Sequence, residues 1–169
     1  MHIRPATLED AENLSALAIQ VWLHTYATQG VSSVVSRYVL SELSAKKFEA
    51  VLAEESSTVL VAEKNEYLLG YARVAVGTHC PAPTGAKAEL ATLYVQAPFL
   101  GKGVGGELLS RAEQWAKQHQ DTSLWLTTNS RNSRAIAFYA KHGYTKLGIT
   151  YFDLGNAKHE NLVLGREDA

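Results

Sequence analysis

The chain of 169 residues has a single cysteine and almost no net charge. Cys80 alone cannot form a disulfide within the chain, which excludes a disulfide-stapled secreted scaffold and favours a reducing compartment. The formal charge of −1 gives no basic surface of the kind that nucleic-acid-binding domains use, so nucleic acid is not an expected partner. The histidines lack the spacing of metal ligands, so no metal is expected.

Long apolar runs are also absent. No stretch approaches the roughly 20 apolar residues that cross a bilayer as a helix, so a membrane is not an expected partner. The first residues lack the basic and apolar regions of a signal peptide. We therefore expect a cytoplasmic protein.

The sequence does contain alternating stretches of helical and strand periodicity, and at this length we expect one domain over residues 1–169. Helices are predicted at 7–26 with Thr7 as N-cap, at 32–54 with a break near Ser44, at 106–120, and at 132–143. Strands are predicted at 1–6, 57–64, 66–77, 87–95, 123–128, 144–154 and 160–166, the second and third as a hairpin. This order predicts an α/β (α+β) fold built on one mixed sheet.

The stretch "LGKGVGGELL", residues 100–109, places four glycines immediately before a predicted helix. A strand, a glycine-rich turn and a helix N-terminus together form an anion site, because unpaired amides and the helix dipole both point at the ligand. A simple tight turn is the alternative. Since each glycine weakens the start of the helix, four of them favour a ligand that the backbone must approach.

Two phosphate-binding patterns can be compared with this loop. A P-loop needs Ser or Thr after its lysine, but Gly103 follows Lys102. The dinucleotide pattern Gly-x-Gly-x-x-Gly is present at Gly101, Gly103 and Gly106. However, the next predicted strand does not end in the acidic residue that this pattern requires. A dinucleotide site is therefore the weaker alternative.

The stretch "LYVQAPFLGKGVGGELL", followed by "NSRAIAFYAKHGY", resembles the GNAT superfamily of acetyl-CoA-dependent N-acetyltransferases. The signature of that family is Gln/Arg-x-x-Gly-x-Gly/Ala, followed later by Asn, by Ala three residues on, and by an aromatic pair. Leu100 occupies the Gln/Arg position and departs from the signature. The resemblance implies a mixed, mostly antiparallel central sheet flanked by helices on both faces, with acetyl-CoA as cosubstrate and no metal.

The resemblance also implies a cofactor site. The pyrophosphate would lie on the amides of residues 101–106, and the pantetheine arm would run beside residues 93–95, where the fourth and fifth strands splay apart. A backbone amide near Tyr94 or Val95 would bind the acetyl carbonyl and stabilise the oxyanion. Asn132 would contact the cofactor, cap its helix, or do both. The full set is Leu93, Tyr94, Val95, Leu100, Gly101, Lys102, Gly103, Val104, Gly105, Gly106, Asn132, Ala135 and Phe138.

Acetyl transfer to an amine needs a base for the amine and an acid for the departing thiolate. Tyr139 matches the general-acid position of the family; its alternative role is packing on the sheet. Glu89 is the candidate base, directly or through a water, and its alternative is a solvent-facing strand carboxylate. His24 and Tyr26 follow the first helix, where the family often lines its acceptor site.

The resemblance implies direct transfer to a primary amine through a tetrahedral intermediate. The early "WLHTY" and the late "YFDLGNAKHENLVLGR" are similar to the polyamine and diamine acetyltransferase branch. Acetylation of protein N-termini or ribosomal proteins is one alternative, and a non-catalytic coenzyme A-binding regulatory module is another. A homodimer is also compatible with this family.

Overall fold

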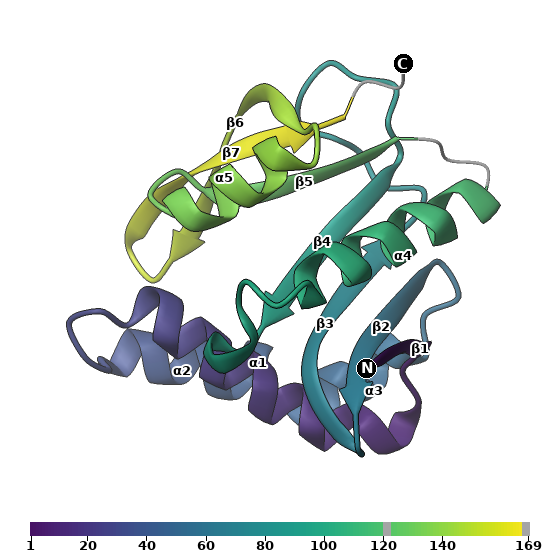
Figure 1. Cartoon of the computed structure of the whole chain (residues 1–169). Coiled ribbons are helices and arrows are strands. Elements are labelled where there is room, and N and C mark those ends of the chain that lie inside the picture. Colours follow the sequence, from purple (N-terminus) through teal and green to yellow (C-terminus); the bar gives the residue numbers. More distant parts are fainter. Residues whose placement is uncertain (120–122, 167–169) are drawn as a thin grey trace. The chain divides into compact units, whose positions relative to one another are not determined.

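The computed structural model describes residues 1–119 and 123–166, and its elements follow the predicted order (Figure 1). The helices are α1 (Ala11–Tyr26), α2 (Ser33–Glu42), α3 (Ala45–Leu52), α4 (Val104–Gln118) and α5 (Ser133–Lys141), with 3-10 turns η1 (Leu8–Asp10) and η2 (Ala97–Phe99). The strands are β1 (His2–Pro5), β2 (Ser57–Lys64), β3 (Tyr67–Ala75), β4 (Ala88–Val95), β5 (Leu124–Asn129), β6 (Thr145–Leu154) and β7 (Ala157–Gly165). The predicted end of the helix corresponding to α4, at Gln120, lies outside the described residues.

The strands form one seven-stranded sheet in the order β1-β2-β3-β4-β5-β7-β6. β4 runs parallel to β5, whereas β1 with β2, β5 with β7 and β6 with β7 are antiparallel. The prediction of a mixed, mostly antiparallel sheet flanked by helices is therefore confirmed. None of the described helices is both long and apolar enough to cross a bilayer.

The chain divides into two compact units, which we describe separately. Unit 1 contains residues 1–73 and 92–112, and unit 2 contains residues 74–91 and the described residues from 113 onward. β4 and α4 therefore each contribute residues to both units. The single domain over the whole chain stays a prediction.

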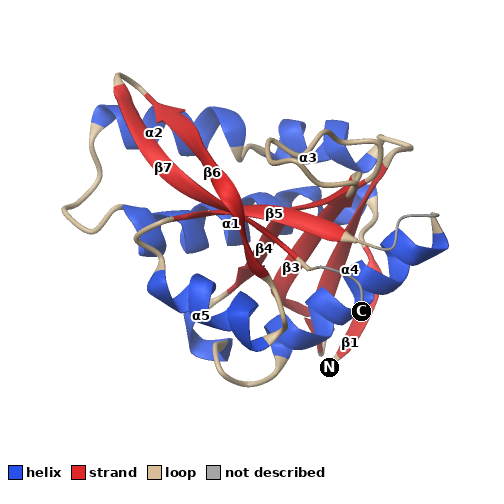
Figure 2. Cartoon of the chain, turned by 90° about the horizontal axis from the view of Figure 1, so that it is seen from above, coloured by secondary structure: helices blue, strands red, loops and turns tan. Residues whose placement is uncertain are grey.

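The core of unit 1 lies between helices and the strands β2 and β3. Buried residues of α1 and α3 pack on Val59, Val61 and Tyr71. The alternate residues Leu60 and Ala62 are also buried, so both faces of β2 are covered. Figures 1 and 2 show how: α3 lies against one face of β2 and β3, and the first half of α4 crosses the other.

The start of α1 differs from the prediction, because the turn η1 precedes it. The Thr7 N–H donates to Asp10 Oδ2 over 2.8 Å, and the Arg4 guanidinium binds both Asp10 oxygens at 2.8 and 2.9 Å. Arg4 also lies 2.6 Å from Glu63 Oε2 on β2. Arg4 holds the pKa of the buried Asp10 carboxyl below its usual range. This ion-pair network joins β1, β2 and the beginning of α1.

Two other predicted boundaries of unit 1 are confirmed with their physical causes. The break near Ser44 is an N-cap, because the Ser44 hydroxyl accepts a hydrogen bond from the Lys47 N–H that begins α3. The β2–β3 hairpin turns at Asn65 and Glu66, whose φ values of 52° and 68° lie in the left-handed region. Two successive residues of this conformation fit the tight turn that the right-handed strand twist favours.

Unit 2 is built on β5, β7 and β6. Trp125 and Val163 pack with apolar residues of the loop between β3 and β4, and Trp125 Nε1 donates to Thr78 Oγ1 over 3.2 Å. β7 begins at Ala157, three residues before the prediction, because the pairing of Leu154 with Ala157 carries the β6–β7 hairpin to its turn. Gly143, with a φ of 83°, follows α5 as predicted.

Candidate active site

The glycine loop of unit 1 leads into α4 earlier than predicted. The helix begins at Val104, so Val104 and Gly105 belong to its first turn rather than to the loop. The Glu107 N–H donates to the Gly103 carbonyl over 3.1 Å and makes the first helical hydrogen bond. The N–H groups of residues 104–106 come before that bond, and a helix provides them with no acceptor of its own. These amides are the donors that α4 can offer to an anion.

The two loop glycines need their backbone freedom. Gly101 and Gly103 have φ values of 72° and 86°, a conformation that side chains disfavour. A Cβ built on either residue would meet no other atom within 4 Å. The space over both residues in unit 1 is therefore open, and a ligand can approach the main chain.

Other groups of the loop are used within it. The Leu100 N–H donates to the Ala97 carbonyl over 3.3 Å, and the Lys102 N–H makes a long 3.4 Å bond to the Phe99 carbonyl. Of the amides at 101–106 that the resemblance assigns to the pyrophosphate, that of Lys102 makes this long bond within the loop. Lys102 is exposed, and its Nζ lies 5.7 Å from the centre of the Phe99 ring.

The C-terminal half of β4 precedes this loop in the same unit. Leu93, Tyr94 and Val95 are half-buried. The Gln96 N–H donates to the Leu69 carbonyl over 3.0 Å, so the contact with β3 persists to the end of β4. The Gln96 side chain donates in turn to Gln20 of α1 over 2.6 Å.

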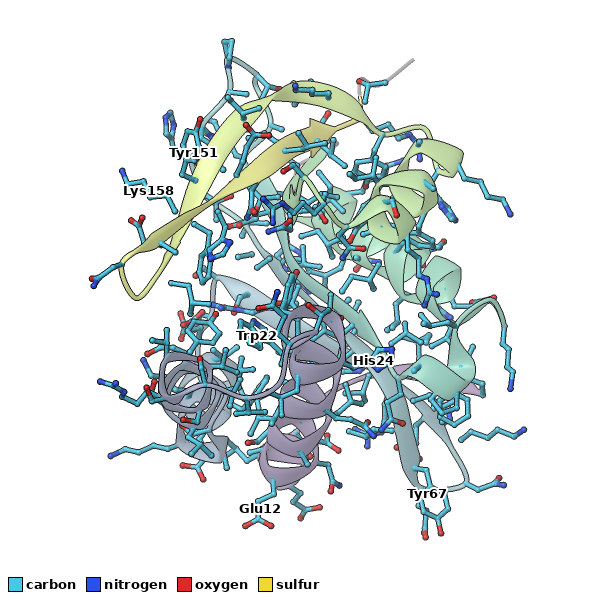
Figure 3. All side chains as sticks on the ribbon, turned by 90° about the vertical axis from the view of Figure 1, so that its left-hand side faces the viewer. Glu12, Trp22, His24, Tyr67, Tyr151 and Lys158 are labelled. Atoms are coloured by element: carbon cyan, nitrogen blue, oxygen red, sulfur yellow. The ribbon has the colours of Figure 1, made fainter. Side chains whose placement is uncertain are left out.

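The predicted acceptor residues lie in the last turn of α1. Tyr26 belongs to an aromatic cluster with Trp22 and Tyr38 of α2, because the Trp22 ring lies 5.0 Å from each of the other two. Trp22 is buried and Tyr26 is 38% exposed, while burial raises the pKa of Tyr38. His24 is exposed and leaves α1 on the opposite side from Trp22 (Figure 3). The structure therefore places Tyr26 with the aromatic cluster and His24 away from it.

In unit 2, the helix α5 carries most of the remaining candidates. Asn132 is its N-cap, with Oδ1 accepting from the Ala135 N–H over 3.1 Å. The Tyr139 ring is 7% exposed and lies 5.2 Å from Phe138 and 5.8 Å from Tyr144. The cap uses the oxygen of Asn132 and leaves its amide nitrogen as a donor, so capping and ligand contact are compatible.

Tyr144, whose ring packs against Tyr139, has a structural role. Tyr144 donates to Glu113 Oε1 over 3.1 Å, and Arg166 lies 3.2 Å from the same oxygen. Burial, with the nearby Glu113 charge, raises the pKa of Tyr144, which therefore stays neutral. Its hydroxyl serves this network, so it does not compete with Tyr139 for the role of acid.

Glu89 lies on the part of β4 that belongs to unit 2, and it is half-buried. The β4–β5 register pairs Ala88 with Leu124 and Glu89 with Trp125. The candidate residues therefore fall into two sets. Unit 1 holds residues 93–95 and 100–106 with His24 and Tyr26, and unit 2 holds Glu89, Asn132, Ala135, Phe138 and Tyr139. Among the described residues, no group of three His, Cys, Asp or Glu side chains is placed to hold a metal.

Comparison with known proteins settles the family. The sequence profile of the acetyltransferase (GNAT) family matches residues 20–144, about three quarters of the chain. The chain belongs to this family. It is accordingly an acyltransferase of the N-acetyltransferase type, and its glycine loop lies inside the matched region.

Individual relatives extend the match over nearly the whole chain. An uncharacterized N-acetyltransferase of Mycobacterium tuberculosis is 29% identical over 161 residues, which cover 95% of this chain and 99% of the relative. The spermidine N(1)-acetyltransferase of Thermoplasma acidophilum is 26% identical over 148 residues, covering 85% of this chain and 88% of that protein. The crystal structure of PaiA N-acetyltransferase from T. acidophilum, in complex with coenzyme A, is similar in fold. Its TM-score is 0.77 at 22% identity, covering 99% of this chain and 98% of that one.

Proposed function

We propose that this N-acetyltransferase moves the acetyl group of acetyl-CoA to a primary amine of a small, polyamine-like acceptor. The observation that carries the proposal is the glycine loop, with its open space over Gly101 and Gly103 and the first amides of α4 beside it. A coenzyme A pyrophosphate suits this site, because backbone N–H groups at a helix N-terminus bind oxyanions without a side chain between them. The exposed Lys102 adds a positive charge beside the loop.

The reactive end of the cofactor is assigned to β4. A pantetheine arm can pair with the backbone of residues 93–95 as an added strand does. A backbone amide near Tyr94 or Val95 then donates to the thioester oxygen, where negative charge develops as the amine attacks. Transfer is direct, through a tetrahedral intermediate, and it needs no covalent enzyme adduct.

Two side chains are proposed to transfer protons during the reaction, one as general base and one as general acid. Glu89 takes the proton of the attacking amine, directly or through a water, and Tyr139 donates to the departing thiolate. In the family pattern, Tyr139 stands one turn after Ala135 on a helix capped by Asn132, and the cap is present. Asn132, Ala135 and Phe138 are proposed to contact the cofactor from this helix.

The acceptor assignment rests on the end of α1. Tyr26 and Tyr38, which pack on the buried Trp22, offer aromatic surface of the kind that binds ammonium groups. The charge of Glu42 on α2 acts on Tyr38, and its carboxylate lies 3.4 Å from the exposed Lys47, a longer and more exposed ion pair than that of Glu54. Glu54 also lies in unit 1, but its carboxylate already binds Arg73 at 2.7 Å. The spermidine acetyltransferase among the relatives supports the same class of acceptor.

The location of the enzyme is part of the proposal. Cys80 is buried as a free thiol, which agrees with a reducing, cytoplasmic compartment.

The acceptor class can be tested with a panel of amines and acetyl-CoA, followed by release of free thiol. We expect the highest kcat/KM for spermidine or a related polyamine, and a lower value for a peptide with an uncharged N-terminal residue. Added salt should reduce polyamine turnover more than peptide turnover, because exposed charges are screened beyond about 8–10 Å at ordinary ionic strength. Glu42→Gln should raise the KM for spermidine, whereas Glu12→Gln, at the other end of α1, is the matched control (Figure 3).

Two results would contradict parts of this proposal. If peptides are acetylated efficiently and spermidine is not, the acceptor is a protein amine. If acetyl-CoA binds but no amine on the panel accepts its acetyl group, the proposed transfer to a small amine is wrong and the coenzyme A-binding module is favoured.

A further inference from the structure

Gly70 occupies an unusual position in the middle of β3. A glycine inside a strand costs conformational entropy and packs nothing, so it commonly marks a close approach of another backbone. A Cβ built on Gly70 would lie 2.5 Å from the Tyr94 carbonyl oxygen and 3.2 Å from both Cα and Cγ2 of Val95. The contacted oxygen belongs to the main chain, so a side chain here would displace β4 itself.

This contact fixes which way the β4 peptides face. The Tyr94 carbonyl lies against Gly70 of β3, and the Gln96 N–H donates to Leu69 of β3. Residues two apart in a strand present their backbone groups to the same edge. Tyr94 and Gln96 therefore face β3, and Leu93 and Val95 present their N–H and C=O groups to the other edge of β4. The peptide bond between Tyr94 and Val95 is trans, so the Val95 N–H points away from the Tyr94 carbonyl and therefore away from β3.

Neighbouring side chains hold this segment of β4 in place. Tyr71 is 2% exposed, and its ring packs edge-on against Tyr94 with 5.6 Å between centroids. The Tyr71 phenol shares a hydrogen bond with the Thr92 side chain. Phe48 of α3 supports the Tyr71 ring from 5.7 Å. Backbone and side-chain contacts of residues 69–71 thus hold residues 92–96 against β3.

We infer that Gly70 is a positioning residue and that the Val95 N–H, rather than that of Tyr94, is the donor to the thioester oxygen. The inference rests on the proposed function, in which β4 binds the acetyl end of the cofactor. By lacking a side chain, Gly70 lets the Tyr94 carbonyl rest against β3, and this turns the Val95 N–H toward the opposite edge. A donor held in this direction before the reaction stabilises the oxyanion without reorganisation.

The variant Gly70→Ala tests the inference, with Gly85→Ala as the matched control. A Cβ at Gly85 would meet nothing within 4 Å, so the same chemical change there displaces nothing. In Gly70→Ala we expect kcat to fall about tenfold or more, part of the 10²–10³-fold loss typical of a missing oxyanion donor. The affinity for coenzyme A without its acetyl group should change much less, because its pyrophosphate binds at the start of α4.

A spectroscopic signal separates positioning from general damage. The carbonyl carbon of ¹³C-labelled acetyl-CoA should resonate downfield of free acetyl-CoA when bound to the wild type, because a hydrogen bond polarises the carbonyl. In Gly70→Ala the bound resonance should move back toward the free position, and in Gly85→Ala it should not. If Gly70→Ala keeps both the wild-type resonance and the wild-type kcat, Gly70 does not position the donor.

A second variant decides the matter if Gly70→Ala does not fold. An α-hydroxy acid introduced at position 95 replaces the Val95 N–H with an ester oxygen and keeps the side chain. The same change at position 85, in the loop between β3 and β4 and outside the proposed cofactor site, serves as the control. We expect the larger loss of kcat and of the carbonyl shift at position 95, and the inference is wrong if the two esters behave alike. Failure of the wild type to bind acetyl-CoA would instead overturn the proposed function.

Discussion

Tyr139 is the residue whose chemical and packing roles can be separated by removing one oxygen atom. Its ring is 7% exposed and packs against Phe138 and Tyr144, contacts that phenylalanine would keep. We predict that Tyr139→Phe folds and binds acetyl-CoA but loses about 10²-fold in kcat, the usual contribution of a general acid. Stopped assays of thiol release measure the loss. Tyr67→Phe, at an exposed position of β3, should retain wild-type turnover, and the same result in Tyr139→Phe would exclude the acid role.

The ion pair of Asp10 with Arg4 predicts how the stability of the protein depends on pH. Its pKa is lowered by Arg4, so the carboxylate stabilises the folded chain above the unfolded-state pKa near 4 and loses that effect as the pH falls. Asp10→Asn should reduce the free energy of unfolding at pH 7 by about 1.5–3 kcal/mol, the scale of hydrogen bonds to charged groups. The difference from wild type should narrow as the pH falls below about 4.

Urea unfolding at several pH values measures this effect. Glu12→Gln, an exposed change in the first turn of α1, should leave stability nearly unaltered at every pH. A difference between Asp10→Asn and wild type that stays constant from neutral to acid pH would mean that the ion pair with Arg4 is not its cause.

The first turn of α4 yields a prediction in which stability and binding change in opposite directions. Alanine is the better helix former, so Gly105→Ala should stabilise the free protein by up to about 1 kcal/mol. The added methyl group would also keep a phosphate from the amides, and we expect coenzyme A affinity to fall about tenfold or more, equal to about 1.4 kcal/mol. Thermal unfolding and calorimetric titration measure the two quantities. Ser110→Ala, on the exposed side of the same helix, should leave affinity unchanged; unchanged affinity in Gly105→Ala would place the phosphates elsewhere.

Most element boundaries could be predicted because their causes are local. Ser44 and Asn132 cap the helices that follow them, and two left-handed residues close the β2–β3 hairpin. The predicted start of the helix at Gly106 lies two residues after the observed start of α4 at Val104, because Gly105 is typical of a loop although the helix includes it. The role of Gly70 was missed for a different reason. A glycine within "LLGYAR" signals a close approach, but the approaching strand is more than twenty residues away in sequence.

For the molecule as a whole, the family is established and the catalytic assembly is a proposal. The match over residues 20–144 includes parts of both units, and the candidate residues are divided between them. The cofactor pattern could be found from the sequence because its residues follow one another at fixed spacing. The acceptor could not, because the aromatic cluster joins α1 to α2 and its selectivity depends on side chains that no short motif records.

The most direct test of the account is one reaction in which both products are counted. Purified protein is incubated with spermidine and ¹³C-labelled acetyl-CoA, free thiol is titrated, and the labelled amine is identified by mass spectrometry. We predict one labelled N-acetyl group on spermidine for each thiol released, with neither product above background when the protein is omitted. Thiol release without labelled spermidine, or no release at all, would contradict the claim that this chain transfers acetyl groups from acetyl-CoA to a polyamine.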